Sequence, residues 1–300
     1  MKRSLSPRDL VLVLAVVTVW GFNFVPIRWA LDEIPPFALA ALRFLLAAVP
    51  AVFFVARPAM RWRDLIAYGL AIGMFQFGLL FLGIKLGMPA GLASLVIQLQ
   101  VFFTIGLAML LLRDRVHRWN VAGGAVALAG VAILGVYKLA GGTSATLAGF
   151  LLVIGAALAW AIGNLIAKRA RNIDTFALVV WSSLAPPLPL AVLSYAVEGG
   201  AAPWRAIAGA SWQTWTCVLF LAYAATLFGY ASWNALLHRY PTALISPFAL
   251  LIPAAGLGSG ALFLHERLAS TQMAGVMLVF AGLAINVYGA RLWRAVARAA

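Results

Sequence analysis

Ten long apolar segments divide the chain and restrict what it can fold into. Each is about twenty residues long, and almost all of the charged residues fall between them or at their ends. A bilayer core about 30 Å thick is crossed by roughly 20 residues of helix, so each segment is long enough to span a membrane. The segments cover residues 10–31, 36–56, 64–84, 89–112, 119–137, 147–167, 175–197, 213–236, 242–264 and 271–292. We therefore expect an all-α integral membrane protein with ten transmembrane helices.

The composition excludes a water-soluble domain. Hydrophobic residues make up 64% of the chain, charged residues only 10%, and the mean hydropathy is +0.99, which is more apolar surface than a soluble core can bury. The segments are continuous and lack the alternation of lipid-facing strands, so they favour helices over a barrel. The single cysteine, Cys217, excludes an intramolecular disulfide.

The positive charge indicates the orientation in the membrane. The formal net charge is +14, but the basic residues are spread over short loops, which argues against a nucleic-acid partner. With a cytoplasmic N-terminus, sixteen of the 22 Lys and Arg residues lie on the inner side and five on the outer side. We expect both termini and the loops 57–63, 113–118 and 168–174 to be cytoplasmic, in a bacterial inner membrane, with 32–35, 138–146 and 198–212 outside.

The sequence repeats itself at a constant offset of 152 residues. The offset matches PAGLAS (89–94) to PTALIS (241–246), LLLRDR (110–115) to LFLHER (262–267) and AGVAI (129–133) to AGLAI (281–285). It also pairs Gly123 with Gly275 and Gly130 with Gly282, where helix backbones can approach closely. The chain therefore divides into two five-helix repeats, 1–138 and 139–300, with an insertion around 198–212.

Five helices are an odd number, so the second repeat must enter the membrane from the side opposite to the first. Inverted repeats of this kind commonly hold a substrate near the midplane and expose it alternately to each side. We therefore expect one membrane domain with a central cavity between the repeats. A membrane enzyme is disfavoured because the sequence has no HExxH motif and no convincing Ser/His/Asp set; a channel or scaffold stays open.

Several of these features together resemble a known family. The segment WGFNF (20–24), Arg43 within ALRFLLAA (41–48) and the paired LLLRDR and LFLHER ends are similar to the EamA-type ten-helix exporters of the drug/metabolite transporter superfamily. The resemblance is greatest to exporters of aromatic amino acids. It implies export of aromatic or other large neutral amino acids through a cavity formed by helices one, three, four, six, eight and nine. The alternatives are export of other small metabolites such as sugars or drugs, or a proton-coupled antiporter.

Two tryptophan–asparagine pairs are candidates for this cavity. Trp20 and Asn23 share a face of the first helix with Ile27. Trp160 and Asn164 are four residues apart on the sixth helix. An asparagine amide offers a donor and an acceptor without a charge, which suits the backbone groups of an amino acid. Bonds between helices would account for the asparagines equally well, and packing for the tryptophans.

Helix eight adds a polar aromatic stripe. Tyr223, Tyr230 and Asn234 are separated by seven and four residues, which aligns them on one face of an α-helix. An aromatic stripe is usually packing, but a hydroxyl or amide without a partner is costly in lipid, which favours a cavity.

Helices three and four contribute amides as well. Ser94 and Gln98 share one face of helix four and Gln100 lies on a different face, so Gln98 is the preferred candidate. Gln76 in helix three is a weaker candidate of the same kind. Bonding between helices would also explain these residues.

Two prolines in helix nine are hinge candidates. Pro247 and Pro253 stand where the first repeat has Leu95 and Val101, and a proline frees a backbone carbonyl and permits a kink. A static kink stabilised by packing is the alternative.

The charged residues bear on coupling and on partners. All eight acids fall at helix ends or in loops, which disfavours sodium coordination or proton antiport through a buried acid. Arg43 lies deep in helix two, where we prefer pairing with an outer acid such as Glu33, or snorkelling, over attraction of a substrate carboxylate. We expect no cofactor and no metal. The expected partners are the lipid bilayer and a small amino-acid substrate, with the protein monomeric or weakly oligomeric.

Overall fold

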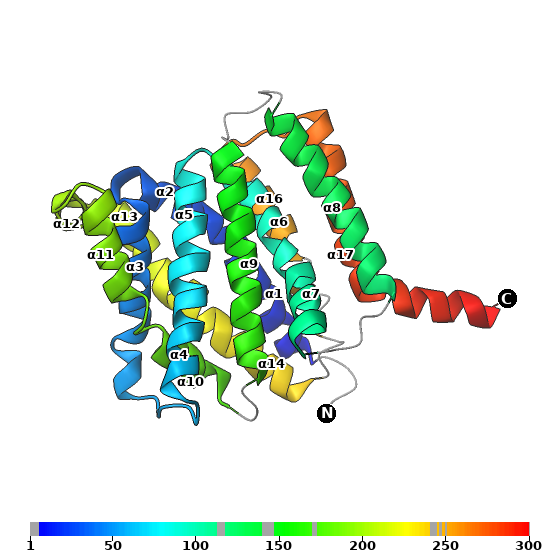
Figure 1. Cartoon of the computed structure of the whole chain (residues 1–300), viewed down its shortest axis with the longest axis horizontal. Coiled ribbons are helices and arrows are strands. Elements are labelled where there is room, and N and C mark those ends of the chain that lie inside the picture. Colours follow the sequence, from blue (N-terminus) through cyan, green and yellow to red (C-terminus); the bar gives the residue numbers. More distant parts are fainter. Residues whose placement is uncertain are drawn as a thin grey trace.

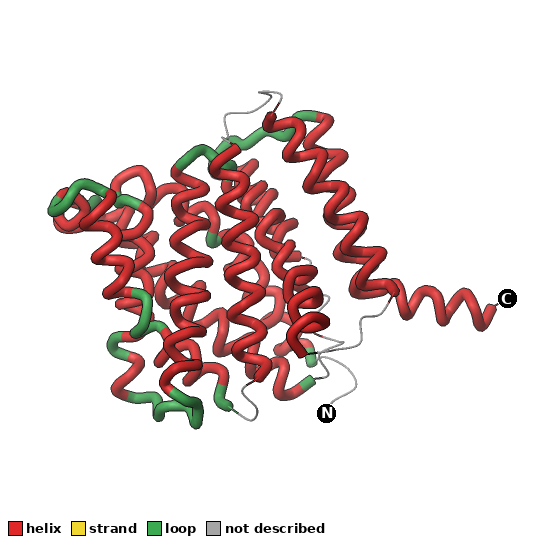
Figure 2. Tube along the Cα trace, in the orientation of Figure 1, coloured by secondary structure: helices red, strands yellow, loops and turns green. Residues whose placement is uncertain are grey.

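The computed structural model describes residues 6–112, 118–139, 147–169, 173–240, 245, 248–249 and 251–299, and these ranges contain helices and no strand (Figure 2). Nine of the helices are long and apolar enough to cross a membrane: Pro7–Glu33, Pro36–Phe53, Trp62–Lys85, Ala90–Leu111, Arg118–Tyr137, Leu147–Ala167, Thr175–Val197, Trp212–Trp233 and Ser270–Gly289. Each overlaps one of the predicted segments. The prediction of an all-helical membrane protein is therefore confirmed for the described residues.

The ninth predicted segment, 242–264, is only partly described. Its described helix is α16 (Leu251–Phe263), which is apolar but shorter than a full span. Residues 241–244, 246–247 and 250 lie outside the described residues, so the tenth spanning helix stays a prediction.

Several of the spans are assembled from shorter helical pieces. They are α1 (Pro7–Phe22) with α2 (Phe24–Glu33); α3 (Pro36–Ala48) with η1 (Ala51–Phe53); α4 (Trp62–Gly69), η2 (Leu70–Gln76) and α5 (Phe77–Lys85); and α6 (Ala90–Val96), η3 (Ile97–Leu99) and α7 (Gln100–Leu112). The remainder are α8 (Arg118–Leu139); α9 (Leu147–Arg169); α10 (Thr175–Ser182) with α11 (Pro187–Val197); the loop helix α12 (Ala202–Gly209); α13 (Trp212–Leu219), η4 (Phe220–Phe228) and α14 (Gly229–Arg239); and α17 (Ser270–Ala299).

Helix starts follow local capping rules. The Ser6 hydroxyl accepts a hydrogen bond from the Asp9 backbone N–H at 3.2 Å, and Pro7 takes the first helical position of α1. Asp174 caps α10 and Ser211 caps α13 in the same way. The cap of α10 positions Thr175, which lines the cavity described below.

Two of the spans contain a π-helical stretch near their middle. In η2 and η4 the backbone bonds run from residue i to i+5, which widens the turn and rotates the side chains that follow. Stretches of this kind are frequent at functional sites. They lie at residues 70–76 and 220–228, close to the 152-residue offset of the sequence repeat.

Glycines bring three pairs of helices into backbone contact. A Cβ added to Gly123 would lie 2.5 Å from the Gly282 carbonyl, and one added to Gly130 would lie 2.6 Å from the Gly275 carbonyl, so α8 and α17 touch at two points. These two helices lie side by side at one edge of the bundle (Figure 1). Gly21 packs in the same way on α16 and Gly83 on α9. Such contacts leave no room for a side chain.

One end of the bundle is held by three carboxylates that accept hydrogen bonds from helix N-termini. Glu266 accepts from the backbone N–H groups of Ala90 and Gly91 at 2.6 and 2.8 Å. Glu198 does the same at the start of α3, at 2.8 and 3.2 Å. Glu33 accepts from the N–H and the hydroxyl of Ser211, at 2.7 and 2.6 Å. Each contact joins parts of the chain more than 150 residues apart and benefits from the helix dipole.

Candidate functional site

A cavity of about 290 Å³ lies among helices from both halves of the chain. Its lining includes Ala167 near the end of α9 and Thr175 at the start of α10, so it lies toward the end of the bundle at which α4 and α10 begin (Figure 1). Its described lining residues are Trp20, Tyr68, Gln98, Gln100, Trp160, Asn164, Ala167, Thr175, Leu178, Val179, Tyr230, Trp233, Ala249 and Ile252. None of these side chains is ionised at neutral pH.

Trp20 organises the aromatic side of this cavity. Its indole N–H donates to the carbonyl of Ala225, inside η4, at 2.8 Å. Its ring centroid lies 5.3 Å from that of Tyr230 and 5.4 Å from that of Trp233, at the spacing of favourable aromatic pairs. A Cβ on Gly229 would fall 2.3 Å from the indole nitrogen. Gly229 therefore provides the space in which the indole reaches η4.

Amides form the other side. The Asn164 side chain donates to the Gln100 side-chain oxygen at 2.8 Å and to the Thr104 hydroxyl at 3.2 Å. Both Gln98 and Gln100 line the cavity, so our prediction that they face different directions is wrong. The reason is the 3₁₀ turn η3 at residues 97–99, because a three-residue turn brings positions i and i+2 closer together around the axis than an α-helix does.

Five of the predicted site residues thus line one cavity: Trp20, Gln98, Trp160, Asn164 and Tyr230. The others are elsewhere. Asn23 and Gln76 are buried, and within the described part of the chain the side-chain oxygen of each has no hydrogen-bond partner. Ser94 is fully buried where α6 meets α16, with its hydroxyl donating to the Gly91 carbonyl at 2.6 Å.

The remaining predicted residues are less informative. Pro253 is buried in α16, three residues after position 250, which lies outside the described residues, so its role as a hinge stays a prediction. Pro247 and the side chain of Asn234 lie outside the described residues.

The predicted tyrosine stripe on helix eight is wrong in one member. Tyr223 is 37% exposed on the outer surface of the bundle, whereas Tyr230 faces the cavity. The seven-residue spacing predicts alignment only for an α-helix, but Tyr223 lies inside the π-helix η4, which continues to Phe228 before Tyr230 is reached. Tyr68 and the α10 residues also line the cavity and were not among the predicted site residues. Apart from being aromatic, Tyr68 has no sequence feature that indicates a cavity. α10 is part of the seventh predicted helix, which is not among the helices expected to form the cavity.

Arg43 is buried behind a second, smaller space. Its guanidinium donates from Nε and Nη2 to the Thr226 hydroxyl, at 3.2 and 3.1 Å, and lies 4.0 Å from the Phe77 ring centroid. Only 2% of its surface is exposed, and Nη1 has no hydrogen-bond partner among the residues that the structure describes. The expected pairing with Glu33, and snorkelling to the surface, are both wrong. Glu33 instead accepts hydrogen bonds from Ser211, the N-cap residue of α13.

The opposite end of the bundle holds a separate groove of about 470 Å³. Arg28 and Asp32, which form an ion pair, line it together with Glu266 and its neighbours. Between this groove and the cavity the helices are in close contact. Gly21 meets Ala255, and the Ser94 side chain fills the space beside Gly256. The two spaces are therefore separated by packed helix crossings.

The chain is similar to known proteins over almost its whole length. The model of the EamA-like transporter family matches residues 8–136 and 147–288. The chain is 44% identical to the "Probable amino-acid metabolite efflux pump" of Escherichia coli (strain K12), over 97% of this chain and 98% of that protein. It is 29% identical to the "Probable terminal-alkyne amino-acid exporter" of Streptantibioticus cattleyicolor, over 92% and 94%. A crystal structure 18% identical in sequence has the same fold, with a TM-score of 0.63 over 96% of this chain and 99% of that one.

Proposed function

Because the chain belongs to the EamA-like transporter family, we propose that it exports amino acids across the bacterial inner membrane and that its substrates are aromatic or other large neutral ones. The family predicted from the sequence motifs is confirmed by this match. The amino-acid substrate accords with the names of two relatives, an amino-acid metabolite efflux pump and a terminal-alkyne amino-acid exporter. The preference for aromatic side chains comes from the cavity.

The observation that carries this preference is the division of the cavity into an aromatic side and an amide side. Trp20, Trp160 and Tyr230 offer ring faces to an apolar side chain. Gln98 and Asn164 offer uncharged donors and acceptors to the backbone groups of the substrate. The volume of about 290 Å³ is at the small end of ligand pockets, which suits a single amino acid.

Alternating access is the mechanism that this arrangement supports. The cavity and the groove lie at opposite ends of the bundle and are separated by packed glycine crossings. In our proposal the present conformation exposes the cavity to the cytoplasm. Rocking of the two repeats would open the α6–α16 contact, close the cavity and connect the substrate with the groove. Ser94, at that contact, and Asn23, also buried, would then meet the substrate in the outward-open state.

We propose the inverted repeat, with halves 1–138 and 139–300, as the basis of this motion. Three observations support it: the family match falls in two stretches, 8–136 and 147–288, the π-helices recur near one offset, and Gly123 contacts Gly282 while Gly130 contacts Gly275. Both termini would then be cytoplasmic, as the basic residues indicate.

Flux measurements test the function directly. In sealed liposomes containing only this protein, with equal pH, equal sodium and no membrane potential, labelled phenylalanine or tryptophan should equilibrate. Unlabelled substrate on the far side should accelerate the exchange. We expect no obligatory ion gradient, because no carboxylate is among the described residues that line the cavity. Amino-acid flux no faster than in protein-free liposomes would overturn the function, and uphill accumulation driven by a pH or sodium gradient would establish ion coupling.

A pair of asparagine variants tests the site. Asn164→Ala removes a cavity amide and should weaken substrate affinity several-fold, as expected for a net loss of about 0.5–1.5 kcal/mol per hydrogen bond. Asn120→Ala is the matched control, because Asn120 bonds Asn286 between α8 and α17 at 2.6 Å and neither residue lines the cavity. Equal affinities in the two variants would remove Asn164 from the site.

A further inference from the structure

We infer that Arg43 is the binding group for the carboxylate of the transported amino acid, at an inner subsite that the substrate reaches from the cavity. The inference rests on the proposed function, since it assigns one charge of the same substrate. It follows from the incomplete set of partners around a buried cation.

A guanidinium in the interior of a membrane bundle normally pairs with an anion, because an isolated charge is costly there. Arg43 follows the first residue of α3 by seven positions, which is about 10 Å along the helix at a rise of about 1.5 Å per residue. Only 2% of its surface is exposed. Within the described part of the chain no carboxylate bonds to it. Its contacts are the Thr226 hydroxyl and the faces of Phe77 and Phe44. The positive charge is thus solvated by neutral groups, and Nη1 by none.

The orientation of the Thr226 hydroxyl leaves the positive charge of Arg43 available to a carboxylate. The Thr226 hydroxyl donates its own proton to the Leu221 carbonyl within η4, at 2.8 Å. Its lone pairs therefore face Arg43 as a neutral acceptor. A carboxylate is the stronger acceptor and would form two parallel bonds with a guanidinium. An incoming anion can therefore replace a weak partner without breaking an existing ion pair.

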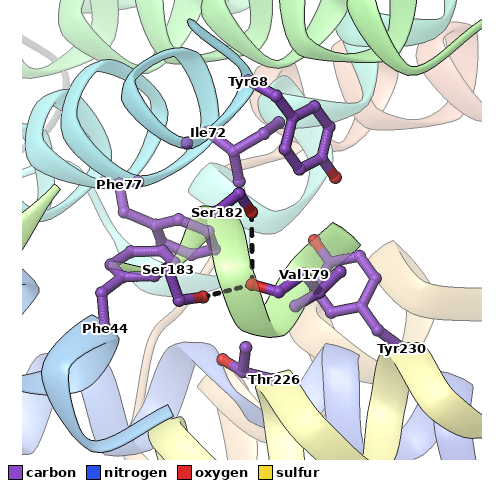
Figure 3. A pocket seen from close by; sticks show the side chains of 11 residues that line it. Phe44, Tyr68, Ile72, Phe77, Val179, Ser182, Ser183, Thr226 and Tyr230 are labelled. Atoms are coloured by element: carbon purple, nitrogen blue, oxygen red, sulfur yellow. Dashed lines mark hydrogen bonds between the residues drawn. The ribbon is translucent and has the colours of Figure 1, made fainter. Parts of the chain in front are cut away.

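The subsite is adjacent to the cavity. A space of about 10 Å³, room for about one water, is lined by Thr226 and Phe77 on the Arg43 side. Tyr68, Val179 and Tyr230 line both this space and the cavity. Figure 3 shows Val179 and Tyr230 near Thr226, with the Tyr68 ring on the far side of the view beside Ile72. Tyr68, Val179 and Tyr230 form the partition between the spaces, and movement of the tyrosine rings would let a carboxylate through.

The chemistry of the ligand follows from this arrangement. One fixed positive charge selects a molecule with a single carboxylate, and the neutral cavity walls accept its apolar side chain. A zwitterionic amino acid meets both conditions. An aromatic amine without the carboxylate does not, because its only charge would be repelled by Arg43.

The first test uses the unmodified protein. Competition for labelled phenylalanine counterflow is measured with unlabelled phenylalanine, phenylalanine amide and phenethylamine. We expect the amide and the amine to compete at least about tenfold more weakly, as for loss of a charge-assisted hydrogen bond. Equal competition by all three would overturn the Arg43 assignment and leave the proposed function standing. Absence of any saturable flux of phenylalanine or another large neutral amino acid would overturn both.

Variants locate the effect. Arg43→Gln should weaken phenylalanine binding at least about tenfold and reduce the discrimination between phenylalanine and its amide to near one. Arg43→Lys, which keeps the charge but not the two-pronged geometry, should retain part of the discrimination. The control is Arg205→Gln, which removes an exposed arginine of the loop helix α12. A merely structural role for Arg43 predicts equal weakening for all ligands and an unchanged ratio, and that result would refute the inference.

Discussion

The Glu266 contact with α6 offers a quantitative test of alternating access. Glu266 bonds the N–H groups of Ala90 and Gly91 through separate carboxylate oxygens, at 2.6 and 2.8 Å. The carboxylate is also enclosed by glycines, because a Cβ on Gly91 or Gly260 would lie within 2.8 Å of it. This fit joins the loop after α16 to the start of α6 and favours the closed form of the groove end.

Glu266→Gln should release that end. The glutamine has one acceptor oxygen and presents an NH₂ group to the second backbone N–H, so one charge-assisted bond is lost and the other becomes neutral. We take the net loss as about 2 kcal/mol, which raises the ratio of open to closed forms about 30-fold. The same variant should therefore shift the protein toward the outward-open state.

A buried cysteine can report this change. Ser94 is fully buried beside Gly256, so Ser94→Cys in a Cys217→Ala background reacts with a small impermeant thiol reagent only when the α6–α16 contact opens. We expect Glu266→Gln to accelerate labelling from the outside about 30-fold, in proportion to the open fraction. The measurement is the labelling rate in right-side-out vesicles.

The matched control for this experiment is Glu198→Gln. Glu198 accepts from two backbone N–H groups at the start of α3 and from the Ser194 hydroxyl, but it joins α11 to α3 and not α6 to α16. It should lower stability to a similar extent without accelerating the labelling of Ser94→Cys. Equal acceleration by both variants would mean general loosening, and unchanged labelling in Glu266→Gln would mean that the contact does not control opening.

Three further variants test the packing. Gly229→Ala places a Cβ 2.3 Å from the Trp20 indole nitrogen and should weaken substrate affinity several-fold by displacing the ring; Gly258→Ala, which meets nothing within 4 Å, is its control in a binding assay. Gly123→Ala should lower stability by about 1–3 kcal/mol, because its Cβ would lie 2.5 Å from the Gly282 carbonyl; thermal unfolding in detergent compares it with Gly106→Ala, and an equal midpoint would contradict the close crossing. Tyr240→Phe removes the hydroxyl that donates to Asp9 at 2.6 Å and should cost about 1–3 kcal/mol, measured the same way; no loss would show that Ser6 and Arg239 satisfy the Asp9 carboxylate without it.

The membrane spans could be predicted from the sequence because each depends on one local property, the length of an apolar run. The candidate tryptophans and asparagines were found for a similar reason, since a polar side chain in an apolar run stands out. Trp20, Trp160 and Asn164 accordingly line the cavity. Asn23 satisfies the same criterion but is buried away from the cavity, because a polar residue in an apolar run does not show which neighbouring helix it will face.

The errors have a common physical source. Periodicity arguments assume a uniform α-helix, but η3 and η4 depart from it. The 3₁₀ turn brings Gln98 and Gln100 together, and the π-helix separates Tyr223 from Tyr230. The hydrophobic pattern shows neither the 3₁₀ turn nor the π-helix, because a turn that is tighter or wider by about one residue leaves the composition of the segment unchanged.

The partners of Arg43 could not be predicted for a different reason. Proximity along the chain favoured Glu33, ten residues away, but the carboxylate of Glu33 instead accepts hydrogen bonds at the start of α13. Thr226, which Arg43 does contact, is 183 residues away. A long-range contact between a cation and a hydroxyl has no counterpart in charge patterning.

The crossing of α8 and α17 has a consequence for how such a chain can arise. At the 152-residue offset Gly123 corresponds to Gly275 and Gly130 to Gly282, yet each glycine contacts the counterpart of the other. This reciprocal pattern is the one that a two-fold axis imposes on two identical subunits. On the proposed inverted repeat, a half-length ancestor would have needed only two glycines to form both contacts with a second copy inserted upside down. Fusion of the halves then releases each of the four positions to mutate singly, so a change that would have disturbed two contacts in the ancestral pair now disturbs one.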